Sequence, residues 1–137
     1  MSAQLDRIDV SGWNLRNTTS LYYLFGDNHT KEIIGLNTWD TSNITNMSFM
    51  FFQCDNLKSL DLSNFDTSNV TTMYLMFYRS SNLKSLDLSN FDTSNVTTVS
   101  NMFAYCSSLK LLNLDNWNLS SLIFDSNNTS NIANIFG

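Results

Sequence analysis

The sequence predicts a repeat solenoid of the α/β class, built from five stacked repeat units, and two observations lead to this fold class. The stretch NLKSLDLSNFDTSNVTT occupies positions 56–72 and occurs again, without a substitution, at positions 82–98. Extending this period of 26 in both directions places large apolar residues in fixed columns along nearly the whole chain. Duplication at such a period is typical of proteins whose units stack on one another.

The columns set the boundaries of the units at 8–33, 34–59, 60–85, 86–111 and 112–137. Every unit starts with a large aliphatic residue, and these residues are Ile8, Ile34, Leu60, Leu86 and Leu112. The sixth position of every unit is a large aromatic residue, and these residues are Trp13, Trp39, Phe65, Phe91 and Trp117. We therefore expect one domain over residues 1–137, whose first and last units are diverged and cap-like.

Each unit is expected to begin with a short parallel strand. In the third unit Leu60 and Leu62 alternate with polar residues, which is the period-two pattern of a strand with one buried face. One unit cannot bury its own apolar face, so the strands of neighbouring units should pair side by side.

A short helix or 3₁₀ turn is expected in the second half of each unit. In the third unit the polar stretch 66–69 is followed by the apolar residues Val70, Met73, Met76 and Phe77. Spacing of three to four residues is typical of a helical turn with one apolar face, and Asp, Thr, Ser and Asn are good N-cap residues. Such short polar side chains can also form turns in a chain with four glycines and no proline.

Two polar columns are interpreted as structural. The asparagines of one column, Asn17, Asn43, Asn69 and Asn95, are expected to bridge the backbones of successive turns. The aspartates of the other, Asp40, Asp66 and Asp92, are expected to cap the turn that follows. A calcium role of the aspartates is the alternative, but the sequence lacks the glycine-rich spacing of calcium-binding repeats and EF-hand loops, so we expect no metal ion.

The whole repeat, L-x-x-L-x-L-x-x-F followed by D-T-S-N-V-T-x-M-x-x-M-F-x-x-C-x-x-L, resembles the BspA-like class of leucine-rich repeat, found in bacterial cell-surface proteins. The matching residues of the third unit are Leu57, Leu60, Leu62, Phe65, Asp66, Thr67, Ser68, Asn69, Val70, Met73, Met76, Phe77 and Leu83. The resemblance weakens at 13–15 and 117–119, and the fifth unit is expected to carry an insertion around 123–128. It implies a leucine-rich-repeat-like fold, as a fragment or repeat domain of a surface protein.

Charge and hydropathy exclude two classes of partner. The net charge is −5 and the seven basic residues are scattered, whereas nucleic-acid binding requires clustered Lys and Arg. The sequence has no run of about 18 apolar residues and no export signal at its start, so we expect no membrane insertion by this segment. The initial Met and the end at Gly137 suggest a segment excised from a longer protein.

The chain is not expected to be an enzyme or to hold a cofactor. Its single histidine, His29, lies in a polar turn, and no nucleophile-elbow, zinc-protease or P-loop motif occurs. Cys54 and Cys106 occupy the same column two units apart, with Ser80 between them. Strands spaced about 4.8 Å apart would separate these cysteines by about 9–10 Å. A disulfide needs Cα atoms within about 7 Å, so both thiols should be free.

Two surfaces are candidates for ligand binding. One is aromatic, around the predicted helical turns, and its residues are Tyr22, Tyr23, Phe49, Phe52, Tyr74, Tyr78 and Tyr105. The other is the exposed strand face, and its candidate residues are Asp61, Asp87, Lys58 and Lys84. Two alternatives stay open: the rings fold down and widen the core, or the strand face is only solvated.

These observations favour a non-catalytic, extracellular binding module on a bacterial cell surface, which acts in adhesion to a host protein or glycoprotein. The resemblance suggests this role, since the residues themselves indicate only a repetitive surface without catalytic groups. The alternative is a structural spacer or stalk that presents another domain and binds nothing itself. End-to-end self-association is a further hypothesis, because exposed end turns of a stack can pair with another copy.

Overall fold

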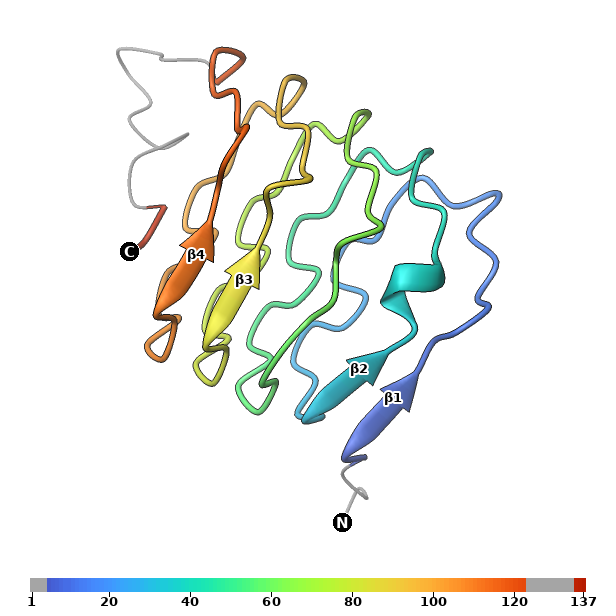
Figure 1. The fold of residues 1–137 in the computed structure, drawn as a ribbon, viewed down its shortest axis with the longest axis vertical. Helices are drawn as coiled ribbons and strands as arrows, with labels where there is room; N and C mark the ends of the chain where they lie inside the picture. Colours follow the sequence, from blue (N-terminus) through green and yellow to red (C-terminus); the bar gives the residue numbers. More distant parts are fainter. Residues whose placement is uncertain (1–4, 123–134) are drawn as a thin grey trace.

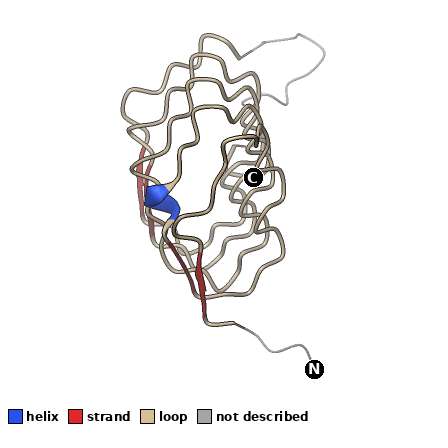
Figure 2. Ribbon diagram, turned by 90° about the vertical axis from the view of Figure 1, so that its right-hand side faces the viewer, coloured by secondary structure: helices blue, strands red, loops and turns tan. Residues whose placement is uncertain are grey.

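The computed structural model describes residues 5–122 and 135–137. Its regular elements are the strands β1 (Arg7–Asp9), β2 (Glu32–Ile34), β3 (Ser85–Asp87) and β4 (Leu111–Asn113), and the 3₁₀ helix η1 (Leu36–Thr38). β1 pairs in parallel with β2, and β3 pairs in parallel with β4, so that two separate two-stranded sheets form (Figure 1). Most of the remaining described chain consists of loops and turns (Figure 2).

The predicted fold class is wrong. Helix is confined to the three residues of η1 within the described chain, and every strand has only three residues. No strand includes Leu60, so Leu60 does not lie on a strand beside Leu86, and β1–β2 and β3–β4 form two separate sheets. Five stacked helix–strand units of a solenoid are therefore not what the chain forms.

Backbone dihedrals explain why the predicted helical turns do not form. Eight residues in two columns have left-handed φ angles between 53° and 59°, and they are Tyr23, Phe49, Leu75 and Asn101 in one column and Asp27, Gln53, Arg79 and Tyr105 in the other. A left-handed residue interrupts any right-handed helix of L-amino acids. Successive turns replace the helix, as where the N–H of Gly26 donates to the carbonyl of Tyr23 at 3.0 Å.

Parallel backbone bonds join segments that are separated by about one repeat unit in the sequence. We call the stretches 8–33, 34–59, 60–85 and 86–111 the first to fourth windings, and Figure 1 shows them side by side. Single parallel bridges connect the four windings at Ser20, Asn46, Thr72 and Thr98. Next to these bridges Met47 donates its N–H to Thr72 O at 3.0 Å, and Phe49 donates to Tyr74 O at 2.9 Å. The period of the sequence is therefore the spacing of this backbone pairing.

Stacked rings fill the core between the windings. Phe25, Phe51, Phe77 and Phe103 lie 5.7, 5.5 and 5.8 Å apart by ring centroid. Phe136 continues the column 5.9 Å from Phe103. Its distance from Phe103 along the sequence exceeds one period, as expected for an insertion in the fifth unit. The expected insertion site, 123–128, itself lies outside the described residues.

The first two windings pair one residue out of the predicted register. Ile8 lies opposite Ile33 and not opposite Ile34, whereas Leu86 lies opposite Leu112, as the period requires. The second winding therefore has one additional residue at this point, and Gly35 and the helix η1 accommodate it. After it the register is restored, because Val10 and Leu36 are one full period apart and both are buried. The predicted column that began with Ile8 and Ile34 is corrected accordingly.

Gly35 is required at this register shift for two reasons. Its φ angle of 89° is one that L side chains rarely adopt. A Cβ added there would overlap the Oγ and backbone N of Ser11 and lie 2.7 Å from the Ser11 Cα. None of the described residues belongs to a helix long and apolar enough to cross a membrane.

Gly35→Ala should lower the free energy of unfolding by more than about 2 kcal/mol, because the substitution adds both backbone strain and overlap with backbone atoms. The measurement is urea denaturation. Gly12→Ala is the matched control, since Gly12 has a φ angle of 74° but no atom within 4 Å of an added Cβ. The control should lose only about 1 kcal/mol. Equal losses in the two variants would show that the contact with Ser11 does not matter.

Candidate functional site

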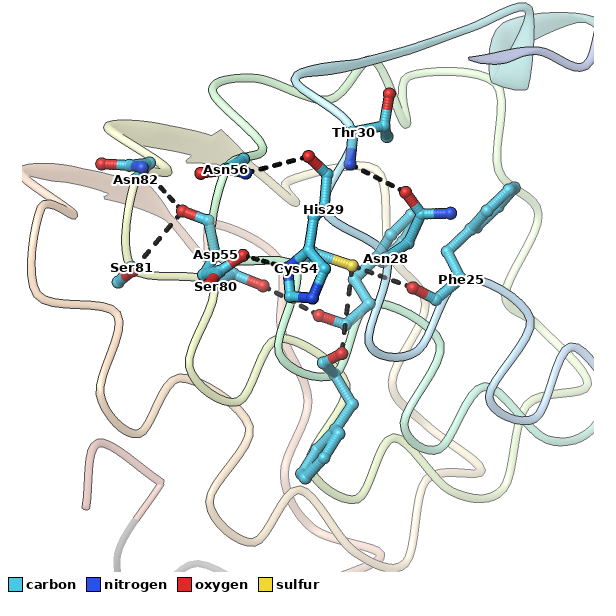
Figure 3. A network of polar contacts seen from close by, with 12 residues as sticks. Phe25, Asn28, His29, Thr30, Cys54, Asp55, Asn56, Ser80, Ser81 and Asn82 are labelled. Carbon is cyan, nitrogen blue, oxygen red and sulfur yellow. Dashed lines mark hydrogen bonds and ion pairs between the residues drawn. The ribbon is translucent and has the colours of Figure 1, made fainter. Parts of the chain in front are cut away.

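A column of small side chains ties each winding to the preceding one. The Sγ of Cys54 donates to Phe25 O at 3.1 Å, the Oγ of Ser80 to Phe51 O at 2.8 Å, and the Sγ of Cys106 to Phe77 O at 3.0 Å. Figure 3 shows this column for Cys54 and Ser80. The same slot therefore accepts either Cys or Ser, because each supplies one donor to a carbonyl of the winding before it.

Both thiols are free, as predicted. Burial raises the pKa of the Cys54 thiol to about 12 and the pKa of the Cys106 thiol to about 11. The thiolate is the nucleophilic form of cysteine, so the two residues are protonated and unreactive near neutral pH. Their role here is to pack and to donate hydrogen bonds.

Asparagine side chains connect the windings at two of the four predicted positions, Asn69 and Asn95, whereas Asn17 and Asn43 make no side-chain hydrogen bond to another described winding. Asn69 Nδ2 donates to Ser42 O and Asn95 Nδ2 to Ser68 O, both at 2.7 Å. A second column does the same, since Asn56 Nδ2 donates to His29 O at 3.0 Å and Asn82 Nδ2 to Asp55 O at 2.6 Å (Figure 3).

The aspartate column caps turns, which confirms the second structural prediction. Asp40 Oδ1 accepts the N–H of Ser42 at 3.1 Å, and Asp92 Oδ1 accepts the N–H of Ser94 at 2.9 Å. The side chains that bridge windings or cap turns thus form the structural frame of the protein. Ligand-binding side chains must be sought elsewhere.

The seven predicted aromatic residues form one exposed patch, which we call the aromatic patch: Tyr22, Tyr23, Phe49, Phe52, Tyr74, Tyr78 and Tyr105. None of the seven is buried, whereas the aromatic residues of the core come from other columns. Four of the rings are exposed, and those of Phe49, Phe52 and Tyr78 are half-buried. Tyr22 and Tyr105, at opposite ends of the patch, are 56% and 64% exposed.

The rings of the aromatic patch touch one another across all four windings. Tyr22 and Phe49 lie 5.4 Å apart by ring centroid, Phe49 and Phe52 5.2 Å. Phe52 and Tyr78 lie 5.2 Å apart, and Tyr78 and Tyr105 5.3 Å. Aromatic pairs at such distances hold each other in place, so the patch presents a continuous apolar surface with tyrosine hydroxyls on it.

Three residues of the aromatic patch occupy left-handed backbone positions: Tyr23, Phe49 and Tyr105 have φ angles of 58°, 59° and 59°. This conformation costs an L-residue about 1–2 kcal/mol, and Gly or Asn would adopt it more easily. Strained positions that carry unfavourable residue types are often functional. The backbone therefore does not explain why rings occur here.

The strand-face candidates lie apart from the aromatic patch. Lys58, Lys84, Asp61 and Asp87 are all exposed. Asp61 and Asp87 each accept hydrogen bonds from a serine two residues on, Ser63 and Ser89, and these bonds lower the pKa of both carboxyl groups from the ordinary value of 3.8. Within residues 5–122 and 135–137 no hydrogen bond, ion pair or ring contact connects the four residues with the aromatic patch.

A polar groove opens at the Tyr105 end of the aromatic patch. It has a volume of about 470 Å³ and is lined by Gln53, Asp55, Arg79, Ser81, Tyr105 and Ser107. The guanidinium carbon of Arg79 lies 5.8 Å from the centroid of the Tyr105 ring. Asp55 Oδ1 lies 2.7 Å from His29 Nδ1, so one carboxylate oxygen of the groove is already engaged (Figure 3).

Five of these six groove residues were missed by the sequence reasoning, which found only Tyr105. A signal was present: each of the two left-handed columns holds four different residue types, Tyr, Phe, Leu and Asn in one and Asp, Gln, Arg and Tyr in the other. The column of Phe25, by contrast, is phenylalanine in all four windings. Variation within a near-identical repeat marks the positions that the frame does not determine.

The site offers stacking and hydrogen-bonding groups. No three His, Cys, Asp or Glu side chains come together to hold a metal ion in the part of the chain that the structure describes. The geometry thus combines an apolar aromatic surface with an adjoining groove that carries one guanidinium group, one carboxylate, hydroxyls and an amide.

These features define a protein made of a repeated sequence unit, with variable side chains gathered on one surface. The profile of a family described as "Mycoplasma protein of unknown function, DUF285" matches residues 19–136. The chain belongs to this family, since the match covers most of its length. No curated protein and no solved structure matches the chain.

Arg79→Asn should raise the free energy of unfolding by roughly 0.5–1 kcal/mol, because Asn accepts the left-handed conformation more readily than Arg. Arg79→Ala is the matched control, since it removes the same side chain but keeps the unfavourable conformation. We expect urea denaturation to rank Asn above both Ala and the parent. If Ala stabilises as much as Asn, the gain comes from loss of the charge and the backbone argument is wrong.

The carboxylates of Asp61 and Asp87 should contribute stability that is lost in acid. Their folded pKa values are lowered, so the contribution is present above the unfolded value of 3.8 and disappears as the pH falls through the folded values. The variant Asp61→Asn/Asp87→Asn should therefore lose stability at pH 7 and show a shallower decline below about pH 4. Denaturant midpoints at a series of pH values measure this.

Asp115→Asn is the control for the acid experiment, because the Asp115 carboxylate accepts no hydrogen bond from a described residue. Its denaturation curves should follow those of the parent at every pH. An unchanged acid decline in the double variant would mean that the serine hydrogen bonds do not stabilise the fold.

Proposed function

We propose that the protein is a non-catalytic binding module of a bacterial cell surface, which recognises a host extracellular protein or glycoprotein through the aromatic patch. The observation that carries the proposal is the continuity of this patch: seven exposed or partly exposed rings touch across four windings. Exposed apolar surface of this kind is unfavourable in water unless a partner covers it.

The chemistry of tyrosine supports a protein or glycoprotein partner. Tyr combines an apolar ring with a hydroxyl group and has few rotatable bonds, so it gives a large contact area at a small loss of entropy. Tyr is enriched at interface positions that contribute most to binding. Four of the seven residues, Tyr22, Tyr23, Tyr74 and Tyr105, are exposed tyrosines.

The resemblance of the repeat to BspA-like leucine-rich repeats supports the cell-surface and adhesion parts of the proposal. This support comes from sequence motifs, such as the stretch 56–72, and from the bacterial name of the family. The protonated thiols of Cys54 and Cys106, each bonded to a main-chain carbonyl, support the absence of catalysis.

A structural spacer is the second candidate function. The hydrogen bonds that Ser80, Asn69 and Asn95 make to other windings favour it, because they tie successive windings into a stiff array. A stiff array could hold another domain at a distance without binding a partner, but it does not require exposed rings.

Retention of mucin and soluble matrix proteins on the immobilised protein tests the proposal. We expect Tyr74→Ala/Tyr78→Ala to weaken binding at least tenfold, about 1.4 kcal/mol, because these rings join the two ends of the aromatic patch. The tyrosine variant, the control variant and the parent must show the same cooperative thermal unfolding. Arg16→Gln, at an exposed position of the first winding, is the control and should bind as the parent does.

The strand face supplies the second arm of this experiment. Loss of binding in Asp61→Asn/Asp87→Asn but not in the tyrosine variant would move the interface to the strand face and contradict the role of the patch. Retention of neither mucin nor any matrix protein by the parent would favour the spacer.

A further inference from the structure

The groove beside Tyr105 has the composition of a small-ligand site. Its volume of about 470 Å³ falls within the range of roughly 300–1,000 Å³ that such sites occupy. Hydroxyls of Ser81 and Ser107, the amide of Gln53, the guanidinium of Arg79 and the carboxylate of Asp55 line it, with one aromatic ring as its apolar wall. Such a lining suits a ligand that is itself rich in hydrogen-bonding groups.

We propose that this groove binds a carboxylated sugar residue of a glycan, with the sugar carboxylate on Arg79 and an apolar face of the sugar on the ring of Tyr105. The proposal rests on the function proposed above and specifies which part of a glycoprotein is recognised. A pyranose ring fits the lining because it has one face of C–H groups and a rim of hydroxyl groups.

Arg79 is the group that selects an acid. Its planar guanidinium can donate two parallel hydrogen bonds to a carboxylate, which a lysine cannot do. Arg79 is exposed, and its side chain forms no ion pair with any residue in 5–122 or 135–137. The contact with the Tyr105 ring, at 5.8 Å, holds the guanidinium at the groove.

The remaining polar groups suit the hydroxyl groups of a sugar. The Oδ1 atom of Asp55 is engaged by His29 Nδ1 at 2.7 Å, which fixes the carboxylate and leaves Oδ2 to accept a hydrogen bond. The Gln53 amide can both donate and accept, and so can the hydroxyl group of Ser107. Hydrogen bonds of this kind discriminate strongly between ligands that offer a partner and ligands that do not.

The overall charge favours a ligand with a single acidic group. A chain with a net charge of −5 repels a polyanion, and Arg79 is the one cationic residue among those that line the groove. A sugar with one carboxylate on an otherwise neutral body avoids this repulsion and still uses the guanidinium.

Backbone strain gives independent support. Gln53, Arg79 and Tyr105 have φ angles of 54°, 57° and 59°, so half of the groove-lining residues occupy positions where Asn or Gly would be more stable. Strained positions that carry unfavourable residue types are often found at functional sites.

Titration of the folded protein with 3′-sialyllactose and with lactose, followed by NMR, tests the proposal. The parent should bind 3′-sialyllactose at least tenfold more tightly than lactose. Arg79→Lys should lose part of this preference and Arg79→Gln all of it, while Tyr105→Asn should weaken binding of both sugars. Tyr105→Asn suits the left-handed backbone, so the variant should fold as the parent does, and its thermal unfolding curve checks this. Arg16→Gln is the matched charge control and should keep the preference.

Three outcomes would overturn the proposal. One is equal affinity for lactose and 3′-sialyllactose, and another is an unchanged preference in Arg79→Gln. The third is displacement of the sugar by succinate at equal concentration, which would identify a simple anion site and not a sugar site.

Mucin treated with a sialidase separates this proposal from the general one. Retention of mucin that survives both sialidase treatment and Arg79→Gln would contradict the sugar site while the binding module stands. A parent protein that retains no mucin or matrix protein but still prefers 3′-sialyllactose would contradict the module and support the groove.

Discussion

The structure depends on one constraint: alternate N–H groups of each winding must meet carbonyl oxygens of the next winding, about one repeat unit further along the sequence. The bonds from Met47 to Thr72 and from Phe49 to Tyr74 are of this kind. Alternate N–H groups must point toward the neighbouring winding, and the chain must close a turn between them. Both requirements are met only if some residues have left-handed φ angles. The repeated left-handed φ angles at positions such as Leu75 and Arg79 are the consequence. The sequence period, the turns and the strain thus have one cause.

This constraint divides the side chains into two sets. Residues that face a neighbouring winding must fit the same space in every turn, so Phe25 and its equivalents are invariant and the column of Cys54 accepts only small side chains from the second winding on. Residues at the left-handed positions protrude from the backbone, and the side chains that they contact in the next winding differ from one winding to another, as Phe49 does for Tyr23 and Tyr105 for Arg79. They can vary without disturbing the frame. The aromatic patch and the polar groove are both built around such positions, which explains why an extremely regular chain still carries a non-repetitive surface.

Sequence reasoning recovered the spacing of the backbone pairing, the free thiols and the Asn69 and Asn95 bridges, because each follows from which residues recur at the repeat period. It named the residues of the aromatic patch but left open whether their rings are exposed or part of the core. It failed on the elements themselves. Apolar spacing of three to four residues, as in Val70, Met73 and Met76, is satisfied by a helix and equally by a run of turns, and hydropathy says nothing about the sign of φ. The usual signal for a left-handed residue, Gly or Asn, is absent at Leu75 and Arg79. The register shift at Gly35 was not predicted, because one added residue does not change the 26-residue period of the columns. The groove was not predicted, because its residues lie in columns that vary from one winding to the next.

At the left-handed positions, the residue type that best stabilises the backbone differs from the residue type found on the surface. At Arg79 and Tyr105 the backbone alone would favour Asn or Gly, and each departure costs about 1 kcal/mol or more. The hydrogen bonds from Thr, Asn, Ser and Cys side chains between windings can offset these costs, since they recur from the second winding on. A chain whose only task was to keep its own shape would gain by giving up Arg and Tyr at these positions. Their presence in an otherwise repetitive protein supports the proposal that a partner contacts them.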